Sequence, residues 1–317
     1  MGAAAVPVVK GLNCPNCGGS LSVRAFEHTL TVVCPQCLSI LDAKDPNLQV
    51  LQQFEGKQRV TLQIPLGSRG QWQGVVYEVV GFQQRTIRVS GESYSWGEYL
   101  LFNPYKGFRY LTVYNGHWND VRTVRALPES PTFSLRPQAR LDDVSYRHFQ
   151  SADAETTYVL GEFPWQVRRG ERVRAMDYVA PPLMLSSETT ESEVVWSRGR
   201  YVGGDEIWSA FKLQGQAPKP VGVFANQPSP WSDRMGRMWR LYFYLIVATL
   251  AAMVFFMIAA RNEEVFRQRF TFAPGASGQQ SLVTPVFELK GHTANVALSV
   301  KTDLSNNWAY FNYALIN

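Results

Sequence analysis

Residues 94–124, YSWGEYLLFNPYKGFRYLTVYNGHWNDVRTV, decide the fold class of this chain of 317 residues. The stretch holds three short runs rich in aromatic and β-branched residues: YSWGEYLLF (94–102), FRYLTVY (108–114) and HWNDVRTV (117–124). Runs of this composition favour strands. Asn115-Gly116, which separates the last two runs, is a strong signal for a two-residue hairpin turn. The stretch therefore predicts consecutive antiparallel strands.

The same pattern continues on both sides of this stretch. VTLQIPL (60–66) and VVYEVVGF (75–82) precede it, and a second strand-rich block follows the polar loop 127–143. Short strands at regular spacing, with turn residues between them, predict small antiparallel barrels or sandwiches. We expect two such modules, at 57–125 and 144–213, in a mainly β protein. Charged residues make up 18% of the chain and apolar residues 45%, which excludes a mainly disordered protein.

All four cysteines lie near the N-terminus, as Cys14-Pro-Asn-Cys17 and Cys34-Pro-Gln-Cys37. Two such pairs, sixteen residues apart, have the spacing typical of a zinc ribbon. Two residues between thiolates let one tight turn place both sulfurs about 2.3 Å from the same metal ion. We therefore expect a zinc ribbon at 10–42 that holds Zn²⁺ through Cys14, Cys17, Cys34 and Cys37. Two disulfides or four free thiols are the alternative.

The expected zinc is structural, because four thiolates complete a tetrahedral shell and leave no position for a catalytic water. Between the cysteine pairs, Ser20–Arg24 and Thr29–Val33 are predicted to form a hairpin across Glu27-His28, with His28 in solvent rather than on the metal. The ribbon lacks the basic stripe with interleaved aromatic residues that nucleic-acid binding needs. Nucleic acid is therefore not an expected partner.

Residues 241–260, LYFYLIVATLAAMVFFMIAA, form an uncharged run of twenty residues, long enough to cross the hydrocarbon core of a bilayer as a helix. A Pro-rich linker at 214–235 is expected before it. A buried core helix is the alternative, but the run has no polar face. Because zinc thiolates need a reducing compartment, we expect a single-pass protein whose N-terminus is cytoplasmic and whose partners include the lipid bilayer.

Residues 261–317 are predicted to be β-rich again and to lie outside the cytoplasm. Four strands in these 57 residues can bury little apolar surface, so we expect a partial β-sandwich with an exposed edge. Unpaired strand edges bind other strands. The expected partners of this segment are other membrane-associated proteins or a second copy of the chain.

Several longer motifs of the chain resemble a known family. They are IPLGSRG (64–70), EYLLFNPYKGFRYL (98–111), GEFPWQVRRGERV (161–173), DYVAPPLMLSSE (177–188) and WSRGRY (196–201). These motifs are similar to those of the domain-of-unknown-function 4178 family, and the resemblance covers residues 12–260. It implies a membrane-associated bacterial protein of the inner membrane, with a role in envelope maintenance or stress, and it brings no enzymatic activity with it.

Trp96 and Glu98 lie two residues apart in a predicted strand, so they share one face. Together with Trp118 they are candidates for a cleft that binds a ligand or partner. In the alternative, Glu98 tethers a backbone amide or pairs with an arginine such as Arg109 inside the sheet.

A basic cluster surrounds Gly170 and consists of Arg168, Arg169, Arg172 and Arg174. In a hairpin around this glycine, the last two arginines share one strand face. The cluster is a candidate surface for anionic headgroups or nucleic acid. The alternative is a solvated edge that discourages strand aggregation.

Motifs of common enzyme classes are missing from the sequence. There is no phosphate-binding loop, no dinucleotide-binding glycine motif and no nucleophile elbow, so we expect no catalytic residues. The expected function is a membrane-anchored, non-enzymatic scaffold that links cytoplasmic and extracytoplasmic β modules. The alternative is a membrane-tethered enzyme or small-ligand sensor that uses the cleft near Trp96, Glu98 and Trp118.

Overall fold

The structure is a computed structural model that describes residues 10–53, 60–129, 137–259, 263–271, 281–288, 295–314 and 316. The chain divides into two compact units, Met1–Met235 and Gly236–Asn317. The first unit contains every strand of the described residues, and each unit is described by itself below.

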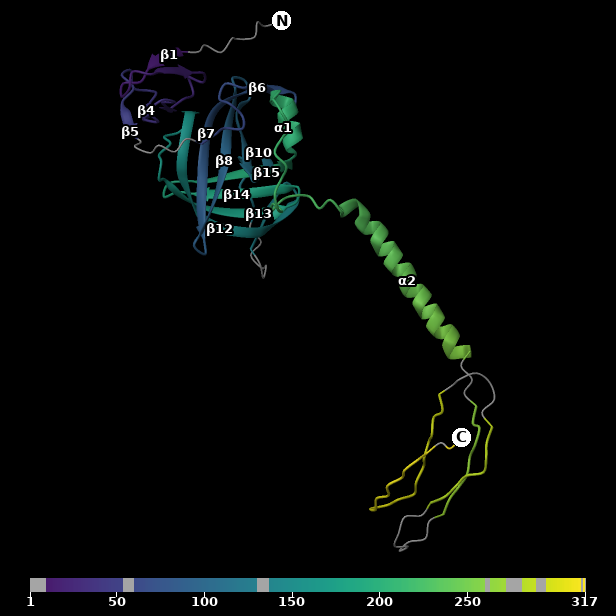
Figure 1. Cartoon of the computed structure of the whole chain (residues 1–317). Coiled ribbons are helices and arrows are strands. Elements are labelled where there is room, and N and C mark those ends of the chain that lie inside the picture. Colours follow the sequence, from purple (N-terminus) through teal and green to yellow (C-terminus); the bar gives the residue numbers. More distant parts are fainter. Residues whose placement is uncertain are drawn as a thin grey trace. The chain divides into compact units, whose positions relative to one another are not determined.

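Two four-stranded antiparallel meanders build the main body of the first unit (Figure 1). The first consists of β7 (Val75–Val89), β8 (Glu92–Asn103), β9 (Gly107–Tyr114) and β10 (His117–Thr123). The second consists of β12 (Val144–Phe163), β13 (Arg172–Ala180), β14 (Leu183–Thr189) and β15 (Val194–Val202). Pairing of β10 with β15 and of β12 with β7 closes the eight strands into one barrel. The strands expected in two modules, 57–125 and 144–213, therefore share a single closed sheet.

The predicted hairpin at Asn115-Gly116 is confirmed, since these residues connect β9 to β10 with φ angles of 47° and 81°. Two consecutive positive φ values are characteristic of the type I′ turn that fits the twist of paired strands. In contrast, the predicted strand 60–66 is wrong, because this segment carries no strand. Pro65 has no backbone N–H for a ladder, and Ile64 is instead fully buried against the barrel.

Strand register assigns the side chains to two faces of the barrel, because directly opposed residues of paired strands share a face. Tyr99 of β8 lies opposite Leu111 of β9, and both belong to a core cluster that also contains Ile207 and Phe211 of α1 (Gly204–Phe211). This cluster covers the outside of the barrel, together with the short strand β6 (Arg69–Trp72). Helix α1 is amphipathic and buries only its apolar side.

The N-terminal ribbon contains two hairpins, each with one cysteine pair at its tip. They are built from β1 (Lys10–Asn13), β2 (Ser20–Val23), β3 (Thr31–Val33) and β4 (Ile40–Asp42), and β5 (Val50–Gln52) pairs with β4. The predicted pairing of 20–24 with 29–33 is therefore wrong. The tight turn at each cysteine pair reverses the chain, so each strand pairs across its own turn.

Strands β3, β4 and β5 of the ribbon share one continuous sheet with the barrel, whereas β1 and β2 form a separate two-stranded sheet. The last residues of β12 pair with β3, and the first residues pair with β11 (Gln138–Leu141). An apolar cluster packs at the same junction, where Val33 and Ile40 of the ribbon belong to one core cluster with Leu100 of β8. The ribbon is therefore a fixed part of the first unit.

Residues 214–230 of the predicted linker 214–235 contact the barrel. The N–H of Val221 donates to the carbonyl of Asn115 at 2.9 Å, and Asn226 is fully buried. Helix α2 (Ser232–Ala259) follows. Of the helices in the described residues, it is the one long and apolar enough to span a membrane, and none of its residues is buried in the protein.

The described parts of the C-terminal segment 261–317 contain no strand ladder, so the predicted partial β-sandwich is not found in them. Val286 and Trp308 are almost fully exposed, and Phe266, Phe270 and Phe311 are each more than one-third exposed. Ordering a strand costs conformational entropy that burial of apolar surface normally offsets. This short segment offers too little internal burial for that.

Candidate metal centre and charged barrel interior

The four cysteines converge on one point, with their sulfur atoms all within 4.8 Å of one another. The Sγ atoms of Cys14 and Cys37 are 3.7 Å apart, as are those of Cys17 and Cys34. A disulfide requires about 2.0 Å, which excludes the alternative of two disulfides in this structure. Four sulfurs at about 2.3 Å from a tetrahedral metal lie about 3.8 Å from one another. The cluster therefore has the size of a site for one metal ion.

Matching backbone hydrogen bonds build the two cysteine turns. The N–H of Cys14 donates to the carbonyl of Gly19 at 2.8 Å, and the N–H of Cys34 donates to that of Ser39 at 3.0 Å. Each turn also needs a residue with positive φ directly after its second cysteine, which Gly18 and Leu38 provide at 73° and 58°. Glycine adopts this conformation without strain, whereas leucine is held in it by its buried side chain.

The environments of the thiols differ in polarity. Burial raises the pKa of Cys34 to about 12. Burial also disfavours the Cys37 thiolate, but hydrogen bonds from Ser39, Asn16 and Cys17 outweigh it and lower the pKa of Cys37 to about 6. Metal ligation requires thiolates, and a divalent cation supplies the positive charge that buried Cys34 needs. Four protein sulfurs fill a tetrahedral shell, which is the arrangement of a structural metal.

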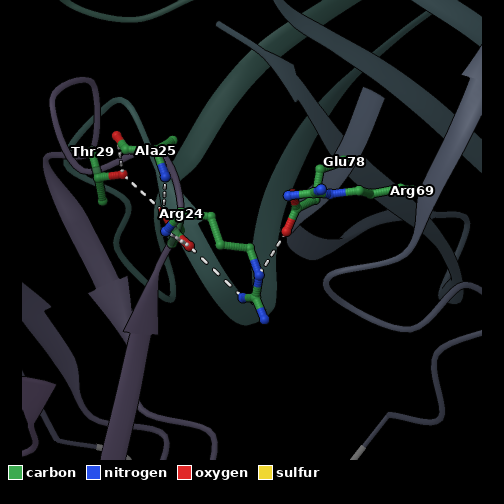
Figure 2. Close-up of polar contacts among 6 residues, drawn as sticks. Arg24, Ala25, Thr29, Arg69 and Glu78 are labelled. Atoms are coloured by element: carbon green, nitrogen blue, oxygen red, sulfur yellow. Dashed lines mark hydrogen bonds and ion pairs between the residues drawn. The ribbon is translucent and has the colours of Figure 1, made fainter. Parts of the chain in front are cut away.

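A buried carboxylate fixes the ribbon to the barrel next to this metal centre. Glu162, at the end of β12, accepts hydrogen bonds from the N–H of Arg24 at 2.7 Å, the N–H of Ala25 at 2.9 Å and the hydroxyl of Thr29 at 3.1 Å. Burial raises the pKa of Glu162, and these hydrogen bonds oppose that shift. Figure 2 shows how Arg24 then reaches Glu78 of β7, which it contacts at 2.7 Å beside Arg69.

Charged side chains lie in the interior of the barrel, where apolar side chains are usual. Arg85 of β7 is 5% exposed and donates through Nη1 to both carboxylate oxygens of Glu188 at 3.0 and 3.2 Å. Because β7 and β14 are not neighbours in the barrel, this ion pair crosses the interior. Glu98 of β8 lies on the same face and accepts from Gln83 and Trp96, both at 2.6 Å.

These charges act on one another and leave one buried donor of Arg85 without a partner. Burial lowers the pKa of Arg85, but Glu98 and Glu188 outweigh it and raise that pKa. The pKa of Tyr110 is raised by burial and then by the same two carboxylates. Within the described part of the chain, the buried Nε–H of Arg85 has no hydrogen-bond partner. A polar ligand or water could accept from it.

The structure brings together two of the three residues proposed for a cleft. Trp96 and Glu98 face the barrel interior, whereas Trp118 is fully buried on the outer face, stacked on Tyr99 at 5.8 Å. The alternative partner Arg109 is also on the outer face, where it pairs with Asp120.

Sequence reasoning missed Arg85 and Glu188. Each of them is a charged residue at a strand position that faces the barrel interior, and this is the pattern that could have indicated them. Their ion pair could not be predicted, because β7 and β14 face each other only once the barrel is closed.

The basic cluster is largely neutralised by neighbouring carboxylates. Arg172 and Arg174 share one face of β13, as predicted, and pair with Glu155 and Asp153 of β12 at 2.8 and 3.1 Å. The guanidinium of Arg169 donates to the carbonyl of Thr157 at 2.7 Å. Arg168 is exposed. The cluster is therefore not a free cationic patch.

Comparisons with known proteins agree with the boundaries of the barrel. Curated proteins and solved structures gave no match to this chain. A family model described as "Domain of unknown function (DUF4178)" matches residues 65–204. The match begins before β6 and ends just after β15, so it is narrower than the expected 12–260 and leaves out the ribbon and α2. The barrel of this chain thus matches the DUF4178 model, and it lies in the sequence between a four-cysteine ribbon and an apolar helix.

Proposed function

We propose that this protein is a single-pass, membrane-anchored and non-enzymatic scaffold whose ribbon and barrel form one rigid cytoplasmic binding body. The observation that carries this proposal is the junction at Glu162. A ribbon tied by a shared strand and three hydrogen bonds to one carboxylate cannot move independently. It extends the surface of the barrel, which suits a docking platform, and a role in envelope maintenance or stress is compatible with it.

Zinc is the metal we propose for the four cysteines. Tetrahedral sites with four thiolates take zinc or iron, and two short C-x2-C turns are typical of zinc ribbons. The bound ion would hold the ribbon in shape and take no part in a reaction, because its shell is filled by protein ligands.

We further propose that α2 spans the inner membrane of a bacterium, with the N-terminus in the cytoplasm. Support comes from the uncharged stretch 241–260 and from the absence of buried residues in α2 (Ser232–Ala259), since a core helix of a soluble protein would bury many of them. The zinc thiolates favour the reducing side for the ribbon. Residues after 260 then lie outside the cytoplasm, where they could pair with other membrane-associated proteins or a second copy.

The test combines membrane extraction with protease protection in intact cells. Full-length chain tagged at the C-terminus should stay with membranes in alkaline carbonate, and protease added outside spheroplasts should remove only the tag. The purified chain should contain one zinc per molecule by atomic emission. Release by carbonate would overturn the anchor, protection of the tag would overturn the orientation, and iron in place of zinc would overturn the metal.

A second candidate function, small-ligand sensing, is favoured by the charged barrel interior. A buried charged group costs more than an apolar side chain of the same volume, and Arg85 is buried inside the barrel beside Glu98 and the partly exposed Glu188. Isothermal titration of the full-length protein with a panel of polar metabolites tests this function. A ligand whose binding is lost in Glu98→Gln would support it. Equal heats for wild type and variant across the panel would reject it.

A further inference from the structure

An open groove of about 550 Å³ lies at one end of the barrel, beside the turn between β13 and β14. Its walls are mostly apolar and include Val144, Val179, Leu183 and the pair Pro181-Pro182. This volume lies within the range of about 300–1,000 Å³ typical of sites for small organic ligands. The groove is separate from the charged interior and from the metal centre, whose residues do not line it.

Arg147 is the charged residue of the groove lining, and it has no carboxylate partner. Within the described residues, its side chain makes no hydrogen bond or ion pair. Other arginines of the same region are paired: Arg140 with Asp143 at 2.8 Å, and Arg198 with Asp142 at 2.7 Å. An unpaired guanidinium beside an apolar wall is complementary to an anion that carries a hydrocarbon chain.

The chain itself ties this groove to the start of α2. The side chain of Asn226 is fully buried and donates to the carbonyl of Pro182, a groove residue, at 3.0 Å and to Asn119 at 2.8 Å. Helix α2 begins at Ser232, six residues later. Six residues extend over at most about 21 Å, which limits the distance between Asn226 and Ser232.

Basic residues occupy the stretch just before the apolar run. Arg234, Arg237 and Arg240 lie in the first turns of α2 and are exposed. Arginines at a cytoplasmic membrane surface attract anionic lipids. Lipid of the required charge would therefore be enriched around the start of α2.

We propose that the groove formed by Val144, Arg147, Val179, Pro181, Pro182 and Leu183 binds an anionic phospholipid at the membrane surface. An acyl chain lies along the valine, leucine and proline side chains, and the headgroup phosphate pairs with Arg147. This inference rests on the proposed membrane anchoring. It gives the body that α2 tethers a second, lipid-specific contact with the bilayer.

The test uses full-length protein in nanodiscs of phosphatidylcholine that contain a small fraction of photoreactive phosphatidylglycerol. Illumination should label the peptide that carries Arg147 or the one that carries Pro181-Pro182, as read by mass spectrometry. Arg147→Gln should reduce this labelling about tenfold, since a charge-assisted contact of this kind is lost. Arg140→Gln is the matched control, because it removes the same charge from a paired arginine nearby, and it should leave labelling unchanged.

Three results would overturn the inference: equal labelling by a photoreactive phosphatidylcholine, equal labelling of Arg147→Gln and wild type, or loss of labelling in millimolar inorganic phosphate. Failure of the anchor is read separately from carbonate extraction. A chain that resists carbonate but leaves the groove unlabelled refutes the lipid site alone, and a chain that carbonate releases refutes the anchor and the lipid site together.

Discussion

Replacing Glu162 with Ala should separate the ribbon from the barrel at a large cost in stability. The substitution leaves the buried N–H of Ala25 and the partly buried N–H of Arg24 without an acceptor, whereas the hydroxyl of Thr29 can still donate to the carbonyl of Ala25 at 2.9 Å. A buried donor left unsatisfied costs about 1–3 kcal/mol. The free energy of unfolding should therefore fall by about 2–4 kcal/mol, a large share of the 5–15 kcal/mol of a typical domain.

Two measurements on the full-length chain in detergent check this prediction. Urea unfolding followed by tryptophan fluorescence gives the loss of stability, and transfer of zinc to a chromophoric chelator reports on the ribbon. Both should change, with faster zinc transfer in the variant. Glu155→Ala is the matched control, because Glu155 lies on the same strand in an exposed ion pair with Arg172, and such pairs contribute about 1 kcal/mol or less. If the two variants unfold at the same urea concentration, the reasoning about the junction is wrong.

The same carboxylate predicts a pH dependence. Burial raises the pKa of Glu162 in the folded protein, so the folded state binds its proton more tightly than the unfolded state does. This contribution to stability is complete below the ordinary carboxyl pKa and is lost as pH rises through the raised value. Relative to Glu162→Gln, wild type should therefore lose stability as pH rises from about 4 upward. A constant difference between the two proteins across that range would contradict the assigned direction.

Three further substitutions test other parts of the structure. Cys34→Ser should abolish zinc binding, measured as metal per chain by atomic emission, because three thiolates no longer complete the shell; one retained zinc per chain would count against the site. Arg85→Met should lower the free energy of unfolding in urea by about 2–3 kcal/mol, since it leaves Glu188 and Glu98 without their cation. Adding Glu188→Met should recover most of that loss. An equal or larger loss in the double variant would argue against the ion pair. Gly116→Ala should destabilise the protein more than Gly74→Ala, although both glycines have a φ of +81°. The reason is that the Cβ added at Gly116 would lie 2.8 Å from the carbonyl oxygen of Lys219, whereas the Cβ added at Gly74 has no atom within 4 Å. Equal shifts of the melting temperature would show that the positive φ alone determines the loss of stability.

Local chemistry made some features predictable from the sequence. The spacing of Cys14, Cys17, Cys34 and Cys37 specifies the four-cysteine cluster because each C-x2-C turn is a self-contained unit. Asn115-Gly116 specifies a hairpin because few residue pairs adopt two consecutive positive φ angles. The run 241–260 specifies a long apolar helix by length and composition. In each case the determining contacts lie within a few residues of one another in the chain.

Features that depend on distant pairing were not predictable. The barrel closes because β12 is twenty residues long and changes partner along its length, from β13 to β7 to β3. Its register shifts between His148 and Gln150 and again between Thr156 and Tyr158, and such bulges redirect a strand. Sequence alternation alone could not assign Trp118 and Glu98 to opposite faces of a closed sheet, because it does not show which strands are neighbours.

Two glycines explain how one strand can serve both the barrel and the ribbon. A Cβ on Gly161 would lie 2.3 Å from the carbonyl oxygen of Val80, and one on Gly81 would lie 2.5 Å from that of Glu162. Their absence lets β7 and β12 approach closely where β12 leaves the barrel and pairs with β3. The backbone that positions Glu162 for the ribbon is therefore the same backbone that closes the barrel. A change that disturbs either the ribbon or the barrel register would therefore weaken this seam, so we expect ribbon and barrel to unfold as one cooperative unit rather than as two domains in contact.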